Sequence, residues 1–184
     1  MKLSSISLGL ASVVLAAAMP AQAALDDAGF ESALGSAWST SGSVARSSDD
    51  AYSGSWSLLL ADADASATYS FSTGIAVSAI SELSLYVKSA SGPLNYVVFG
   101  YSDGSSGTSY AIDDLGGSSD WEQFSLLADL GTGKTLTSLT LYGNSGASTF
   151  IDDIALVTAV PEPATWAMFG AGALLLAARR RRGG

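Results

Sequence analysis

Acidic side chains are the most numerous groups in this sequence that could do chemistry. The 184-residue chain has 17 Asp and Glu, no His and no Cys. The lack of imidazole and thiol groups excludes His-based catalytic triads, thiol nucleophiles and metal sites built from His or Cys. Carboxylates remain, and they can bind hard cations such as calcium or act in pairs as the acid and base of a glycosidase.

Most of these acidic residues occur as close pairs. Adjacent side chains of a strand point to opposite faces, so such a pair does not supply the two facing carboxyl groups of a glycosidase. The many serines form no Gly-x-Ser-x-Gly motif, and the sequence has no phosphate-binding or dinucleotide-binding fingerprint. We therefore expect a protein that is not an enzyme, and we interpret the pairs as solvated loop positions: Asp26/Asp27, Asp49/Asp50, Asp62/Asp64 and Asp113/Asp114.

Aromatic residues offer a second kind of chemistry, because their faces stack on the polarised C–H groups of sugar rings. Trp38, Trp56 and Trp121 are expected to pack in the framework. The better candidates for a glycan-binding platform are four tyrosines on segments that would form central strands: Tyr86, Tyr96, Tyr101 and Tyr110. Simple packing is the alternative for these tyrosines. Lys88, on the predicted face of Tyr86, would pair with a uronic acid or with a neighbouring carboxylate.

Short alternating apolar segments position these side chains and indicate an all-β domain. Residues 81–89, for example, place Leu83, Leu85 and Val87 on one face and Tyr86 and Lys88 on the other. About nine such strands, separated by Ser/Gly turns, predict a sandwich or a barrel. The segments are 38–45, 55–61, 66–73, 81–89, 94–102, 108–115, 121–127, 136–143 and 149–157.

The N-terminal residues have the features of a secretion signal. Lys2 precedes an apolar, small-residue stretch over residues 6–19, and Ala21-Gln22-Ala23 fits the small-x-small pattern that signal peptidase cleaves. We predict a signal peptide over residues 1–23, with cleavage after Ala23.

The C-terminal residues predict a short membrane segment. Residues 164–178 carry no charge, and as a helix they would span roughly 22 Å of a hydrocarbon core of roughly 30 Å. Pro161 and Pro163 end the preceding strand. The arginine cluster that follows favours the cytoplasmic side: Arg179, Arg180, Arg181 and Arg182. We therefore predict a domain over residues 24–160 and a terminal region over residues 161–184 with a transmembrane helix.

The order Pro161-Glu162-Pro163, apolar helix and arginine cluster resembles the PEP-CTERM sorting signal. The resemblance implies handling by an exosortase in the inner membrane of a bacterium with two membranes, cleavage near the Pro-Glu-Pro motif, and release to the cell surface or extracellular matrix. It also implies an association with exopolysaccharide and biofilm. A permanent single-span anchor without processing is the alternative.

The charge of the predicted domain is strongly negative. Three of the eight Lys and Arg and sixteen of the seventeen Asp and Glu lie in residues 24–160. Such a surface repels nucleic acid and anionic lipid, and it favours cations. The lack of cysteine means that this exported domain does not depend on disulfides.

Four motifs follow one another in the order seen in carbohydrate-binding-module-like, or galactose-binding-like, β-sandwiches: Gly29-Phe30-Glu31, Trp38, Ser53-Gly54-Ser55 and Phe150-Ile151-Asp152-Asp153-Ile154. The resemblance covers nearly the whole domain. It implies a single jelly-roll β-sandwich.

Several of these modules hold a structural calcium that ties the first strand to the last. Carried over to this sequence, the ligands would be Glu31 and one of Asp152 or Asp153, with carbonyl oxygens from residues 51–55. Alternation puts the two aspartates on opposite faces, and we expect Asp153 to be the ligand because Asp152 shares its face with apolar residues. A pair of solvated carboxylates at a strand end is the alternative.

Two functions of different class are consistent with these features. One is a non-catalytic surface or matrix protein, sorted by its tail, that contributes to a layer of extracellular polysaccharide. The other is a specific carbohydrate-binding module with a calcium-stabilised sandwich. An exposed aromatic cluster would favour the second, and a smooth Ser/Thr face would favour the first.

Overall fold

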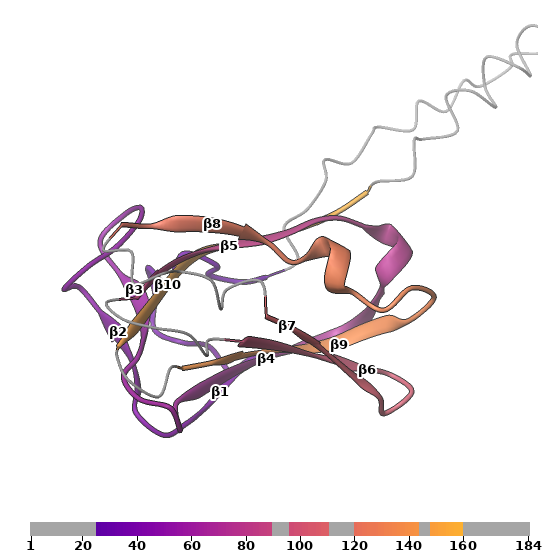
Figure 1. Ribbon diagram of the computed structural model, residues 1–184, viewed down its shortest axis with the longest axis horizontal. Helices are drawn as coiled ribbons and strands as arrows, with labels where there is room; N and C mark the ends of the chain where they lie inside the picture. Colours follow the sequence, from indigo (N-terminus) through magenta and orange to yellow (C-terminus); the bar gives the residue numbers. More distant parts are fainter. Residues whose placement is uncertain (1–24, 90–95, 111–119, 144–147, 160–184) are drawn as a thin grey trace, which may run out of the picture. The chain divides into compact units, whose positions relative to one another are not determined.

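Two stacked antiparallel sheets make up the domain (Figure 1). The structure, a computed structural model, describes residues 25–89, 96–110, 120–143 and 148–159. The β6 sheet has the strand order β1 (Trp38–Ser41), β4 (Ser66–Ala76), β9 (Thr135–Tyr142), β6 (Tyr96–Tyr101), β7 (Ser106–Ser109). The β5 sheet has the order β2 (Val44–Ser47), β3 (Ser57–Leu60), β10 (Thr149–Thr158), β5 (Ile80–Ser89), β8 (Glu122–Ser125). The predicted all-β sandwich is therefore confirmed.

Alternating apolar side chains bury the inner face of each sheet. Phe99 and Leu139 from the β6 sheet, and Leu58, Leu85 and Ile151 from the β5 sheet, have no exposed surface. The opposite side chains of the same strands are left on the two outer faces, because strand side chains alternate. The face assignment for residues 81–89 is confirmed, since Leu83, Leu85 and Val87 are fully buried and Tyr86 and Lys88 are half-buried.

The segment predicted as one strand over residues 38–45 forms two strands in different sheets. Gly42 has a φ of +70° and makes the turn between β1 and β2. A Cβ atom there would lie 2.5 Å from the carbonyl oxygen of Asp64, so this turn requires glycine. The alternation of residues 38–45 does not reveal the turn, because the pattern continues on both sides of it.

All ten described strands lie in one compact unit, Ala21–Ala159, and pair only with one another. No helix among the described residues is long and apolar enough to cross a membrane. The predicted signal peptide, residues 1–23, and the predicted membrane segment, residues 164–178, lie outside the described residues. The domain boundaries stay predictions.

Replacement of Phe99 by Ala should destabilise the domain by about 3–5 kcal/mol, because a fully buried aromatic side chain leaves a cavity. The neighbouring Val98 is half-buried on the outer face, so Val98→Ala should cost about 1 kcal/mol or less. Urea unfolding of residues 24–160, followed by circular dichroism, measures both. Equal losses for the two variants would contradict the assignment of inner and outer faces.

Candidate functional site

Small side chains with hydroxyl groups, from Ser and Thr, cover most of the outer face of the β6 sheet. The strand registers align its residues in three rows that cross the sheet. No residue in the three rows carries a charge, and a hydrogen bond of 2.9 Å joins the hydroxyls of Thr68 and Thr140. The rows are Ser41, Ser66, Tyr142, Tyr96; then Ser39, Thr68, Thr140, Val98, Thr108; then Ser70, Ser138, Gly100, Ser106.

Three tyrosines gather at one end of this face, and we call them the tyrosine triad: Tyr96, Tyr110 and Tyr142. Tyr96 and Tyr142 are directly paired across β6 and β9, and their rings stack with centroids 4.4 Å apart. The Tyr110 ring lies 6.0 Å from that of Tyr96 and has 62% of its surface exposed. Burial and the two neighbouring phenols raise the pKa of Tyr96, so its hydroxyl stays a hydrogen-bond donor.

Two of the triad residues, Tyr96 and Tyr110, were predicted as glycan-platform candidates, and Tyr142 was missed. The available signal was the alternation of residues 136–143, which places Tyr142 opposite to the buried Leu141. What the sequence did not contain is the register that sets Tyr142 beside Tyr96. Residues 111–115 of the strand predicted over residues 108–115 lie outside the described residues.

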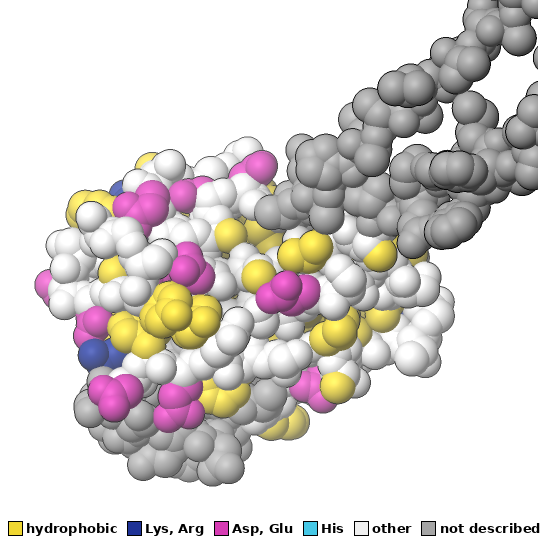
Figure 2. Space-filling view, turned by 90° about the horizontal axis from the view of Figure 1, so that it is seen from above, with side chains coloured by type: hydrophobic (Ala, Val, Ile, Leu, Met, Phe, Trp, Pro, Cys, Tyr) yellow, Lys and Arg dark blue, Asp and Glu magenta, His cyan; other side chains and the backbone are white. Residues whose placement is uncertain are grey.

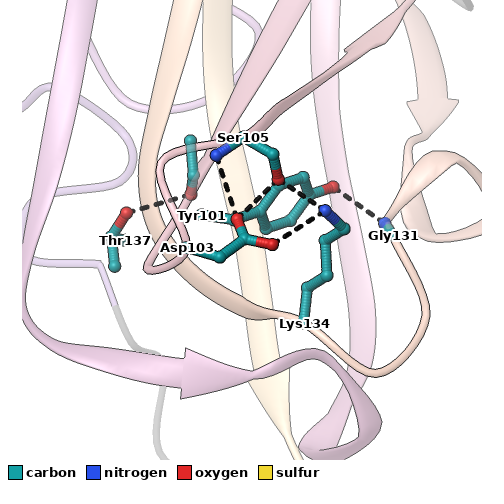
Figure 3. A network of polar contacts seen from close by, with 7 residues as sticks. Tyr101, Asp103, Ser105, Gly131, Lys134 and Thr137 are labelled. Carbon is teal, nitrogen blue, oxygen red and sulfur yellow. Dashed lines mark hydrogen bonds and ion pairs between the residues drawn. The ribbon is translucent and has the colours of Figure 1, made fainter.

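Tyr101, the third candidate, lies inside the domain and does not belong to any platform. Only 5% of its surface is exposed, and its hydroxyl accepts a hydrogen bond of 2.8 Å from the backbone N–H of Gly131 (Figure 3). Alternation along β6 places Tyr101 on the same inner face as the buried Val97 and Phe99. The sequence pattern therefore contained the signal for its burial, and its choice as a platform residue was wrong.

A polar network around Tyr101 fixes the far end of the β6–β7 hairpin (Figure 3). Asp103 accepts hydrogen bonds from the backbone N–H of Ser105 at 2.9 Å and from Lys134 at 3.1 Å. The Lys134 ammonium lies 5.1 Å from the centroid of the Tyr101 ring. The hydrogen bonds from Ser105, followed by that from Lys134, lower the pKa of Asp103 to about 2. The hairpin that carries two of the triad tyrosines is thus anchored at its turn.

Tyr86, the fourth candidate, lies on the outer face of the other sheet. Its ring stacks on Tyr52 with centroids 3.6 Å apart, and Trp121 lies 6.1 Å from Tyr52 with its edge toward the ring. Trp121 therefore belongs to a surface cluster rather than to the core. Two partners were predicted for Lys88, a uronic acid and a neighbouring carboxylate. The structure shows the carboxylate: the Lys88 ammonium lies 2.5 Å from an Asp50 oxygen.

Three carboxylates from distant parts of the chain meet the turn of residues 51–56. Glu31 accepts the backbone N–H groups of Ser55 and Trp56 at 2.8 and 3.0 Å. Asp152 accepts those of Tyr52 and Ser53 at 2.9 and 3.1 Å. The Ser53 hydroxyl donates to Asp153 at 3.0 Å. Each of the three residues predicted as calcium ligands therefore contacts the predicted turn, the two aspartates at Tyr52 and Ser53 and Glu31 at Ser55 and Trp56.

Alternation fails at the two aspartates, so the expectation that only one would reach the site is wrong. Asp153 has a φ of +44°, and the pairing of β10 with β5 shifts between Asp152 and Ala155. This β-bulge lets both side chains contact the 51–56 turn, at Tyr52 and Ser53. A Cβ atom at Gly29 would lie 3.1 Å from an Asp153 oxygen and 3.8 Å from an Asp152 oxygen.

The three carboxylates differ in their electrostatic environment. Hydrogen bonds from the N–H groups of Ser55 and Trp56 lower the pKa of Glu31. Asp152 has no exposed surface, and burial raises its pKa. Among the described residues no group of three or more acidic side chains is gathered as a ready metal site. The donors nevertheless suit calcium chemically, since they are hard oxygens and include a buried carboxylate whose side-chain contacts are N–H groups rather than a cation.

Comparison with known proteins concerns the two parts of the chain separately. Residues 159–182 match the PEP-CTERM protein-sorting motif. The chain carries a PEP-CTERM sorting signal. This signal marks it as a protein that is exported, held in the membrane and sorted by an exosortase, as its terminal motifs predicted. A search of curated proteins found no match.

The sandwich of this PEP-CTERM protein has the fold of carbohydrate-binding modules. A xylan-binding CBM22-1 domain from Paenibacillus barcinonensis is 19% identical with a TM-score of 0.52, over 79% of this chain and 99% of that domain. A family 11 carbohydrate-binding module of a Clostridium thermocellum cellulosomal cellulase is 16% identical with a TM-score of 0.51, over 80% and 99%. A family 11 module from the same organism, solved with a β-1,3-1,4-mixed-linked tetrasaccharide, is also 16% identical with a TM-score of 0.51, over 76% and 97%. At these identities the likeness establishes the fold alone.

Proposed function

We propose that this protein is a non-catalytic polysaccharide-binding module, which exosortase sorting delivers to the cell surface or the extracellular matrix. The observation that carries the proposal is the tyrosine triad at one end of an uncharged Ser/Thr face. Aromatic faces and hydroxyl groups are the side chains with which proteins hold sugar rings. The matrix polysaccharide of a biofilm is the natural ligand for a protein sorted in this way.

The charge distribution favours binding of a neutral glycan over hydrolysis. Glycosidases use two carboxyl groups across the scissile bond, and the three residue rows of the outer β6 face contain none. These three described rows also offer no cation for a uronic acid. Proteins of the same fold are named for binding xylan or were solved with a β-1,3-1,4-mixed-linked tetrasaccharide. Neutral β-linked polysaccharides, such as xylan and mixed-linked glucan, are therefore the first ligands to test.

A sorted matrix protein without a specific ligand is the second candidate. The smooth Ser and Thr rows of the β6 face favour it, because such a surface also suits a hydrated spacer. The stacked Tyr96 and Tyr142 rings distinguish the two functions, since a spacer needs no exposed aromatic cluster.

Affinity electrophoresis of residues 24–160 in gels containing xylan or mixed-linked glucan tests the main proposal. We expect one of these polymers to retard the wild type. Tyr142→Ala and Tyr96→Ala should each weaken binding roughly fivefold, because loss of one stacking contact costs about 1 kcal/mol. Tyr69→Phe is the matched control, since Tyr69 of β4 is a buried tyrosine outside the triad and the β6–β7 hairpin, and loss of its hydroxyl should leave retardation unchanged. If no polymer retards the wild type relative to a gel without polymer, the sorted spacer is left as the function.

We propose further that calcium binds at the 51–56 turn through Glu31, Asp152 and Asp153. Support comes from the burial of Asp152, from the convergence of the two aspartates on Gly29, and from the strongly acidic domain. A bound cation would stabilise the ionised form of Asp152, which burial otherwise disfavours.

Thermal unfolding with calcium and with chelator tests this site. Calcium should raise the melting temperature by several degrees, since a ligand at about 100 times its Kd adds about 2.7 kcal/mol. Asp152→Asn should abolish the rise, whereas the exposed Asp62→Asn should keep it. In chelator, the raised folded-state pKa of Asp152 means that its contribution to stability declines as pH rises above its ordinary value of 3.8. Identical melting with calcium and chelator would exclude the site.

Cleavage of the tail near Pro161-Glu162-Pro163 is also part of the proposal. Intact-mass spectrometry of the protein released from its own cells should show a chain that lacks the arginine cluster at residues 179–182. Deletion of the exosortase should keep the full tail. A released protein with its tail intact would support the permanent anchor instead.

A further inference from the structure

A second aromatic cluster lies on the outer face of the β5 sheet, and we call it the Tyr52 platform: Tyr52, Tyr86 and Trp121. Tyr52 and Tyr86 stack almost parallel, at an interplanar angle of 13°. Tyr52 keeps 44% of its surface exposed, and among the described residues it and Tyr110 are the exposed large hydrophobic side chains. One face of the Tyr52 ring is therefore covered by Tyr86, and the ring remains open to solvent elsewhere.

We propose that the Tyr52 platform is a second sugar-stacking site, and that one molecule bridges two strands of neutral polysaccharide. The inference rests on the proposed function of the tyrosine triad and extends it. It assigns to the protein a cross-linking role in the matrix, which a single binding face would not provide.

The platform is held in place before any ligand binds. Asp152 fixes the Tyr52 backbone through a hydrogen bond of 2.9 Å. The Trp121 indole N–H donates to Asp50 at 3.0 Å, and Asp50 is itself paired with Lys88. The pairing with Lys88, followed by the Trp121 hydrogen bond, lowers the pKa of Asp50, so the carboxylate stays charged. Fixed rings lose little conformational entropy on binding, which favours affinity.

The chemistry around the platform selects uncharged sugars. Figure 2 views the molecule from above, the side on which β8 and β5 lie in Figure 1, and shows hydrophobic side chains gathered among acidic ones. A hydrogen bond with Tyr52 raises the pKa of Tyr86, and the nearby charge of Asp153 adds to this effect. The Tyr86 phenol therefore stays neutral beside the carboxylate of Asp153. Neutral pyranoses fit this combination, and anionic uronates are repelled.

The two aromatic clusters lie on opposite sides of the sandwich. Tyr86 belongs to the outer face of the β5 sheet, and Tyr96 and Tyr142 belong to the outer face of the β6 sheet. Packed sheets are about 10 Å apart, with both inner faces filled by side chains. A polysaccharide strand that lies on one outer face cannot contact the other, so full occupancy requires two strands.

Dynamic light scattering and calorimetry on residues 24–160 with soluble xylan or mixed-linked glucan test the bridge. This part of the chain contains every described strand and its partners. We expect the wild type to increase the particle size of the polymer and to bind a short oligosaccharide of it at two sites. Tyr52→Ala should reduce the stoichiometry from two to one and abolish particle growth. Tyr52→Phe keeps the stacking ring and should behave as the wild type.

The variants separate failure of the bridge from failure of the proposed function. Unchanged stoichiometry and particle growth in Tyr52→Ala, with binding lost in the Tyr96→Ala/Tyr142→Ala double variant, would overturn the second site and leave the first. Residual one-site binding in the double variant, lost when Tyr52→Ala is added, would support the Tyr52 platform. Binding by the double variant at both sites would place the first site elsewhere and overturn the proposed triad.

Discussion

Burial of one face from each sheet is the constraint on which the rest of the structure depends. The inner faces of both sheets are fully packed, with Phe99 and Leu139 opposite Leu58, Leu85 and Ile151. Since side chains alternate along a strand, this packing also fixes what each outer face presents. The strand registers that pack the core therefore also place the two aromatic clusters on the outer faces. A shift of one residue in β5 would exchange the core side chain of Leu85 for that of Tyr86, and in β6 it would exchange Val97 for Tyr96.

Hydrogen bonds over long sequence distances supply what core packing does not. The 51–56 turn carries Tyr52, and its backbone N–H groups are bound by Glu31 and by Asp152, about a hundred residues further along the chain. The bulge at Asp153 breaks the regular strand so that both aspartates face this turn. Such local irregularity is a common way of aiming side chains at a functional position. The position of the turn that carries Tyr52 therefore depends on the hydrogen bonds that Asp152 and Glu31 accept from it.

The sorting tail and the sandwich are two separate parts of the chain, and both support the proposed function. The PEP-CTERM signal determines where the protein goes, and the sandwich fold is one that holds sugars in other proteins. Neither establishes the ligand, because a fold supports many functions and the site decides among them. In this protein the candidate site consists of aromatic rings on uncharged or acidic surroundings, which is suited to neutral polysaccharides.

The sequence by itself determined the features that depend on local pattern. Alternation separated the two faces of residues 81–89, the lack of His and Cys excluded whole classes of site, and the terminal motif predicted sorting. The tertiary structure alone decided the features that depend on register. It paired Tyr142 with Tyr96, set Tyr52 on Tyr86 and joined Asp152 to the 51–56 turn. The physical reason is that alternation is a property of neighbouring residues, whereas strand order and bulges follow from packing the whole core at once.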